Sequence, residues 1–146
     1  MSHLVGLDPG RAKCGLVLVD PEQRLVLEGV VLPVSRVIDQ LTTWSKQGGV
    51  GLILLGNGTS SKQWQPSLRR LASVDVVEEQ GTTLRARERY WQLWPARGWR
   101  KLLPRGMRVP PGDLDAVAAL VMVEDHLGSR CRWPQPRPTF KSVLAP

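Results

Sequence analysis

The sequence has little of what metal clusters, disulfide scaffolds and membrane spans require. Its 146 residues include only two cysteines and two histidines, and neither cysteine lies at a metal-binding spacing. No apolar run approaches the roughly twenty residues that a bilayer-spanning helix needs, and residues 1–7 lack the form of a signal peptide. We therefore expect a cytoplasmic protein with no zinc or redox role for Cys14 and Cys131, and we expect Cys14 to be a small buried hydrophobic residue.

Acidic residues are also scarce. Thirteen Asp and Glu face twenty Lys and Arg, which gives a formal net charge of +7. This excess favours a polyanionic partner, either nucleic acid or an anionic membrane surface. The length fits one domain with or without a tail, and we divide the chain into a domain over residues 1–128 and a proline-rich basic tail over 129–146, extended or disordered.

Apolar runs separated by turn residues indicate the sheet. The first apolar run ends at Asp8, the second begins after Gly15, and the third covers residues 24–33. Turns at Pro9-Gly10 and at 20–23 join them, which predicts a three-stranded antiparallel meander. The continuous run from Val50 to Leu55 is typical of a parallel strand buried on both faces, and residues 74–79 form another strand. We expect an α/β fold with a mixed sheet of five strands, three antiparallel and then two parallel, flanked by helices.

Helical spacing and end signals predict the helices. One is capped by Ser35 and ends at Gly48-Gly49; a second runs towards Leu71; a third is capped by Thr82 or Thr83 and ends before Pro95. Asp113 caps the last, which continues to residue 126 or 127 and is buried over 116–123 because that run is apolar on every side.

Three acids fall at the ends of these buried elements. Asp8 ends the first strand, Glu79 ends the fifth, and Asp115 lies in the first turn of the last helix. Simpler explanations exist: Arg11 or Lys13 could pair with Asp8, and the helix dipole favours an acid at Asp115. If the three converge, Mg²⁺ or Mn²⁺ would relieve their repulsion and favour phosphodiester hydrolysis.

Asp113 and Asp115 differ by two positions, so on one helix they would point to nearly opposite faces unless Asp113 lies outside the helical turn. Because Asp113 is also the predicted cap, we assign Asp115 to the site and give Asp113 a supporting role.

Basic and aromatic residues alternate between Arg85 and Arg108, where eight basic residues meet one acid. Basic groups neutralise phosphates and aromatic rings stack on unpaired bases, although Trp91 and Trp94 could instead pack in the core while the arginines are merely solvated. Asn57 and Thr59, in the loop after the fourth strand, could contact a phosphate or simply join strand to helix. The nucleic-acid contacts that we predict are Arg11, Lys13, Asn57, Thr59, Arg85, Arg89, Arg97, Arg100, Lys101 and Arg105.

Three stretches together resemble the signatures of the YqgF-type nucleases, relatives of the RuvC Holliday junction resolvases in the ribonuclease H-like superfamily. They are Gly6-Leu7-Asp8-Pro9-Gly10, Glu79-Gln80-Gly81-Thr82-Thr83 and Asp115-Ala116-Val117-Ala118-Ala119. The resemblance covers roughly residues 3–128. It implies a ribonuclease H-like fold and a metal-dependent endonuclease with Asp8, Glu79 and Asp115 as catalytic metal ligands, supported by Thr82 and Thr83.

The implied substrate is structured RNA, since bacterial members of this family are associated with maturation of the 5′ end of 16S ribosomal RNA. The first alternative is a Holliday junction resolvase, although RuvC resolvases bring two acids from the last helix one turn apart and Gly112 stands three residues before Asp115. The second is an inactive nucleic-acid-binding module, because Gln80 replaces the family's usual arginine. A nucleotide-binding relative of the actin-like ATPases ranks last. The protein would act as a monomer or homodimer.

Overall fold

The computed structural model describes residues 2–58, 60–78, 81–104, 107, 110 and 113–138. Five strands form one sheet in the order β3-β2-β1-β4-β5. Their bounds are β1 His3–Asp8, β2 Lys13–Asp20, β3 Leu25–Pro33, β4 Val50–Gly56 and β5 Ser73–Val77.

Strand direction follows the predicted pattern. β2 pairs antiparallel with both β1 and β3, whereas β4 pairs parallel with both β1 and β5. The predicted mixed sheet, with three antiparallel strands followed by two parallel ones, is confirmed, and its strand order is that of a ribonuclease H-like fold. β1 is the central strand of the five, so its last residue lies in the middle of the row of strand ends.

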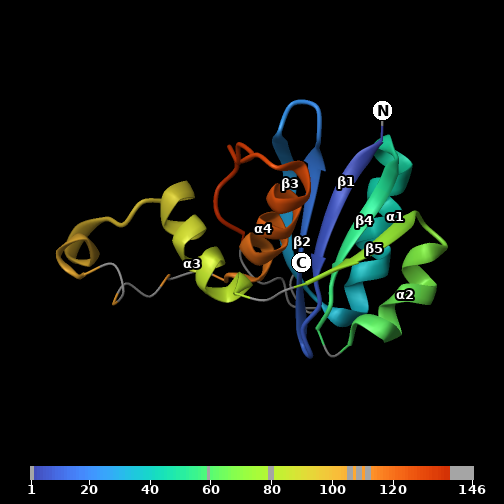
Figure 1. Ribbon diagram of the computed structural model, residues 1–146, viewed down its shortest axis with the longest axis horizontal. Coiled ribbons are helices and arrows are strands. Elements are labelled where there is room, and N and C mark those ends of the chain that lie inside the picture. Colours follow the sequence, from blue (N-terminus) through green and yellow to red (C-terminus); the bar gives the residue numbers. More distant parts are fainter. Residues whose placement is uncertain are drawn as a thin grey trace.

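Helices cover the two faces of the sheet differently (Figure 1). α1 (Val37–Gly48) and α2 (Ser61–Arg69) contribute to one apolar cluster with β1 and β4, while α4 (Asp115–Leu127) packs in a second cluster against β1, β2 and β3. α3 (Thr82–Leu93) lies beside α4 and continues into the short 3-10 helix η2 (Gly98–Leu102). None of the described helices is long and apolar enough to cross a bilayer.

Several helix bounds agree with the predictions. Gly49 ends α1 with a positive φ of 81°, α3 ends two residues before Pro95, and Gly128 follows α4 with a φ of 70°. Residues 116–123 are buried as expected, because α4 lies between the sheet and α3.

The predicted side-chain caps are wrong. Ser35 lies inside the 3-10 turn η1 (Val34–Arg36) that precedes α1, so its hydroxyl is not at the helix start. α3 begins after Gly81, which has a φ of 73°, and neither Thr82 nor Thr83 caps it. Asp113 does not cap α4 either, because its carboxylate binds Lys13 instead.

The C-terminal segment packs along the start of β3, where Leu25 and Arg132 form an isolated β-bridge. Two backbone hydrogen bonds join Arg132 to the start of β3. Val26 N donates to Arg132 O, and Arg132 N donates to Arg24 O, each at 2.8 Å. Trp133 is buried against Gly29, where an added Cβ would come within 2.2 Å of the indole. These contacts join residues 130–138 to the sheet; the division of the chain at residue 128 stays a prediction, and 139–146 lie outside the described residues.

Candidate active site at the end of the central strand

Asp8 is the last residue of β1. Side chains alternate along a strand, so Asp8 shares a face with Leu4 and Gly6, the face on which α4 packs. The residue is half-buried, because it lies at the end of the strand rather than in the middle of the sheet. The central strand therefore delivers this acid to the start of α4.

Two glycines allow α4 to approach the sheet. A Cβ at Gly6 would lie 2.6 Å from the carbonyl oxygen of Ala119, and one at Gly15 would lie 2.0 Å from the carbonyl carbon of Asp115. Gly15 is also the cross-strand partner of Asp8. The first turn of α4 therefore lies directly over the residue paired with Asp8, and this contact brings two of the three predicted acids together.

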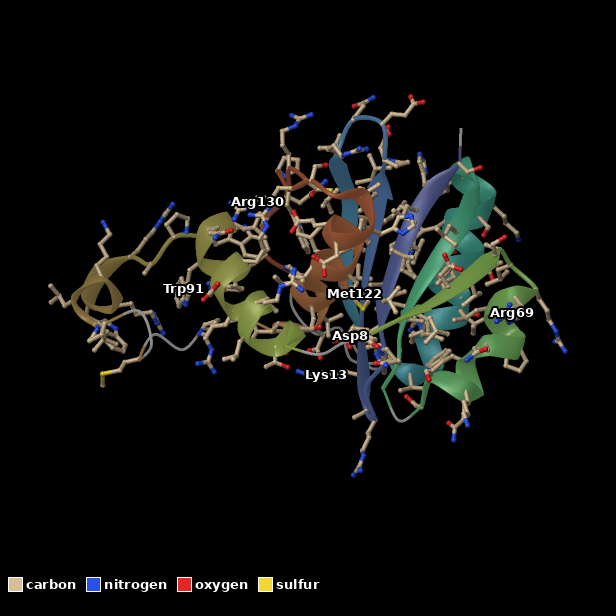
Figure 2. The ribbon with its side chains drawn as sticks, viewed as in Figure 1. Asp8, Lys13, Arg69, Trp91, Met122 and Arg130 are labelled. Atoms are coloured by element: carbon tan, nitrogen blue, oxygen red, sulfur yellow. The ribbon has the colours of Figure 1, made fainter. Side chains whose placement is uncertain are left out.

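Lys13 joins this cluster from the start of β2. Its ammonium group donates a hydrogen bond to Asp113 Oδ1 and lies 3.4 Å from Asp115 Oδ2. The hydrogen bond to Asp113 raises the pKa of Lys13; burial opposes this and the charge of Asp115 adds to it. Figure 2 shows Asp8 and Lys13 at the same end of the sheet.

The expectation that Asp113 and Asp115 face apart does not apply. α4 begins at Asp115, so Asp113 lies before the helix, and both side chains reach the same lysine. The described part of the site thus contains the acids Asp8, Asp113 and Asp115 with the base Lys13.

Cys14 precedes Gly15 on β2, and its thiol is influenced by the charges of Asp8 and Asp115. Its side chain is fully buried, as predicted. Burial is the main cause that raises the pKa of the Cys14 thiol, and the negative charges of Asp8 and Asp115 both raise it further, against a backbone hydrogen bond from Gly10. Both carboxylates are therefore near enough to disfavour the same thiolate.

The chemistry of these donors suits a hard divalent cation, because carboxylate oxygens are the ligands that Mg²⁺ and Mn²⁺ prefer. Within the described residues, no group of three or more His, Cys, Asp and Glu side chains is arranged to hold a metal. Glu79, the predicted third ligand, lies outside those residues, as do Thr59 and Arg105. Three carboxylates with one ammonium group keep an excess of negative charge, which a bound cation would offset.

Two arginines of α3 bind acids of α4. Arg89 donates to both carboxylate oxygens of Glu124, with Nε 2.9 Å from Oε1 and Nη2 2.8 Å from Oε2, and to the carbonyl oxygen of Cys131 at 2.9 Å. Arg85 forms a bidentate ion pair with the carboxylate of Asp125. Their charges hold α3 to α4, a role that the sequence analysis did not assign to them.

Glu124 is the important residue that the sequence analysis missed. It is 8% exposed and accepts a further hydrogen bond from the backbone N–H of Cys131 at 2.7 Å. Its position right after the apolar run 116–123 was a signal, since a charge on the buried side of a helix requires a partner.

The other predicted nucleic-acid contacts are at the surface. Arg11, Asn57, Arg97 and Lys101 are exposed and Arg100 is half-exposed. Trp91 and Trp94 pack against the core with Tyr90, and Trp94 also meets Trp133, with edge-to-face centroid distances of 5.1–5.2 Å. For these two tryptophans the core alternative is correct, whereas Trp99 is 63% exposed.

No protein-family model matches the sequence, and a search of curated proteins found no match. Among solved structures, the chain is similar to Thermus thermophilus RuvC in complex with a Holliday junction substrate, with 15% identity, a TM-score of 0.47, and coverage of 90% of this chain and 99% of that one. It is also similar to a second Thermus thermophilus RuvC structure, with 14% identity, a TM-score of 0.45, and coverage of 92% and 83%. With both TM-scores below 0.5, the likeness carries no argument about this chain.

Proposed function

We propose that the protein is a divalent-metal-dependent endonuclease that hydrolyses phosphodiester bonds in nucleic acid. The observation that carries this proposal is the contact of Gly15 with the backbone of Asp115, which brings the first turn of α4 over the strand pair that ends in Asp8. Two acids more than a hundred residues apart in the chain thereby lie at one edge of the sheet.

Asp8 and Asp115, with Glu79, would hold the cation. These residues would supply the carboxylate oxygens, and a cation held there would lower the pKa of an attacking water and offset charge on the leaving oxygen. Asp8 ends a buried central strand and Asp115 begins a buried helix, so both carboxylates are held by rigid elements. Lys13 keeps Asp113 and Asp115 near each other by sharing its charge between them.

Structured RNA is the substrate that the YqgF resemblance favours, with 5′-end maturation of the 16S ribosomal RNA precursor as the specific proposal. A resolvase of four-way DNA junctions is the second candidate, and one observation favours it. RuvC resolvases take two acids from their last helix; here Asp113, just before α4, and Asp115, in its first turn, both reach Lys13.

Cleavage assays with the purified protein test both candidates. With Mg²⁺ or Mn²⁺, we expect cuts near the 5′ end of a 16S precursor RNA; clean symmetric cuts in a four-way junction and none in the RNA would reverse the order. Asp8→Asn and Asp115→Asn should each lower the rate by about a hundredfold or more, because they remove a ligand charge, while binding is retained. Cleavage by Asp8→Asn at the wild-type rate would refute the assignment of the site, and binding without cleavage of either substrate would support the inactive module.

Lys13 provides a separate test of the acid cluster. Lys13→Met removes a cation that competes for the oxygens of Asp113 and Asp115, so we expect tighter binding of Mn²⁺ in calorimetry. Arg11→Met is the matched control, because Arg11 is a nearby exposed cation in the same turn. Weaker Mn²⁺ binding by Lys13→Met than by wild type would mean that Lys13 organises the site rather than competing for it.

A further inference from the structure

The residues that follow α3, up to residue 104, project away from the sheet (Figure 1). Residues 95–104 contain η2 and lie beyond α3 at the far end of the molecule (Figure 1). Figure 1 also shows that this segment lies far from the end of β1 where the acids gather. Whatever it contacts is therefore separate from the proposed active site.

This segment exposes large apolar side chains. Trp99 is 63% exposed and Leu102 is 86% exposed, whereas Trp44 and Trp133 are buried and Trp94 packs in the aromatic group of α3. A protein rarely leaves a tryptophan and a leucine exposed side by side on one short helix without a use for them. The guanidinium carbon of Arg100 lies 5.0 Å from the centroid of the Trp99 ring, which is a cation–π contact.

The charge of the segment has one sign. Arg97 and Lys101 are exposed next to Arg100, and the sequence contains no acidic residue from position 89 to position 112. On α3, by contrast, Arg85 and Arg89 pair with Asp125 and Glu124. The exposed positive charge around Trp99 is therefore a feature of η2 that these two arginines of α3 do not share.

We infer that Trp99 and the cations around it form a second nucleic-acid contact, which binds an unpaired strand. An aromatic ring stacks on any exposed base and flanking cations neutralise the neighbouring phosphates, and this combination is typical of single-strand recognition. Bases inside a duplex are already stacked, so a tryptophan outside a groove gains nothing from them. A membrane surface suits η2 less well, because five residues are too few for an amphipathic helix to bury an apolar face.

The inference rests on the proposed function for its partner class and adds a feature of the substrate. Nucleic acid that reaches both the acid cluster and η2 must have an unpaired stretch away from the bond to be cut. A substrate with only paired nucleotides should bind through the remaining basic surface alone.

Binding in the presence of EDTA tests this inference apart from catalysis. Fluorescence anisotropy would measure the affinity of the full chain for a labelled single strand of roughly twelve nucleotides and for a blunt duplex of the same sequence. Trp99→Ala should weaken single-strand binding by about ten- to a hundredfold and leave duplex binding within about twofold, while Trp99→Phe should keep most of the affinity because it keeps a ring.

Charge is tested with matched pairs. Arg97→Ala with Lys101→Ala should weaken single-strand binding and lower the slope of log affinity against log salt by roughly one to two. Arg69→Ala with Arg70→Ala removes the same charge from the end of α2, on the opposite side of the molecule from α3, and should change neither quantity (Figure 2). An equal loss in both pairs would show a general charge effect and would overturn the assignment to η2.

Single-strand binding by Trp99→Ala at the wild-type affinity would refute the inference and leave η2 to another partner, such as an acidic peptide. The two proposals fail separately. If the wild type binds single strands through Trp99 but cleaves nothing with Mg²⁺ or Mn²⁺, the nuclease falls and the contact stands. If it cleaves but Trp99→Ala binds normally, the reverse holds.

Discussion

The basic stretch of this chain divides into two parts with opposite roles. On α3, Arg85 and Arg89 bind carboxylates of α4, and Arg89 is largely buried. On η2, the cations surround an exposed tryptophan and no acid is near them in the sequence. Similar composition therefore serves internal stability in one part and, as we propose, contact with a partner in the other; the difference comes from what lies opposite each part.

The largest effect is expected from Arg89→Met. It leaves the Glu124 carboxylate buried without its cation, which costs about 3–5 kcal/mol of the free energy of unfolding. Urea unfolding followed by circular dichroism would measure the loss. Arg89→Met with Glu124→Met should recover most of it, because an apolar pair replaces the buried charge; a single variant as stable as the wild type would remove the distinction between the two parts.

A smaller loss is expected from Trp94→Ala, about 2–3 kcal/mol. The indole is partly buried and packs edge-to-face on Tyr90 and Trp133, so its removal opens the contact between α3 and the C-terminal segment. Thermal unfolding would show a lowered Tm. If Trp94→Ala and Trp99→Ala lowered the Tm equally, the aromatic residues would not divide as the arginines do.

Arg85→Ala should cost less than about 1 kcal/mol, because both partners of this pair are about half exposed and water screens their attraction. The loss should shrink further in high salt, as urea unfolding at two salt concentrations would show. A cost equal to that of Arg89→Met would mean that exposure does not set the strength of these pairs.

The smallest change in stability is expected from Arg97→Ala and Trp99→Ala, within about 0.5 kcal/mol of the wild type. Both side chains are exposed and support no part of the core. The same urea titration is the measurement, and a loss above 1 kcal/mol in either variant would assign η2 to the fold rather than to a partner.

Local patterns in the sequence were enough to predict the sheet and the places of two acids in the fold, while the roles of these acids stay a prediction. Apolar runs and turn residues placed the strands, and Asp8 and Asp115 followed from their positions at the ends of buried elements. The ion pair between Lys13 and Asp113 could not be predicted, because a hundred residues separate them and only the packing of α4 on Gly15 brings them together.

The roles of the tryptophans could not be predicted for a similar reason. Trp94 and Trp99 lie five residues apart in one basic stretch, yet the first packs on Trp133 and the second is exposed. The predictions of the helix caps were wrong because the signals for caps are local and weak. The residue at the cap position of α3 is a glycine with a positive φ rather than a threonine, and the acid expected to cap α4 binds a lysine instead.

The backbone pairing between residue 132 and the start of β3 also concerns self-association. β3 is one edge of the sheet, and such an edge offers open N–H and C=O groups to any other chain. The C-terminal segment occupies backbone groups of residues 24–27 and places Trp133 against Gly29, so it hinders the addition of a strand from another molecule at this part of the edge. A form of the protein truncated after Leu127 would therefore expose this part of the edge strand and aggregate, even with every residue of the acid cluster intact.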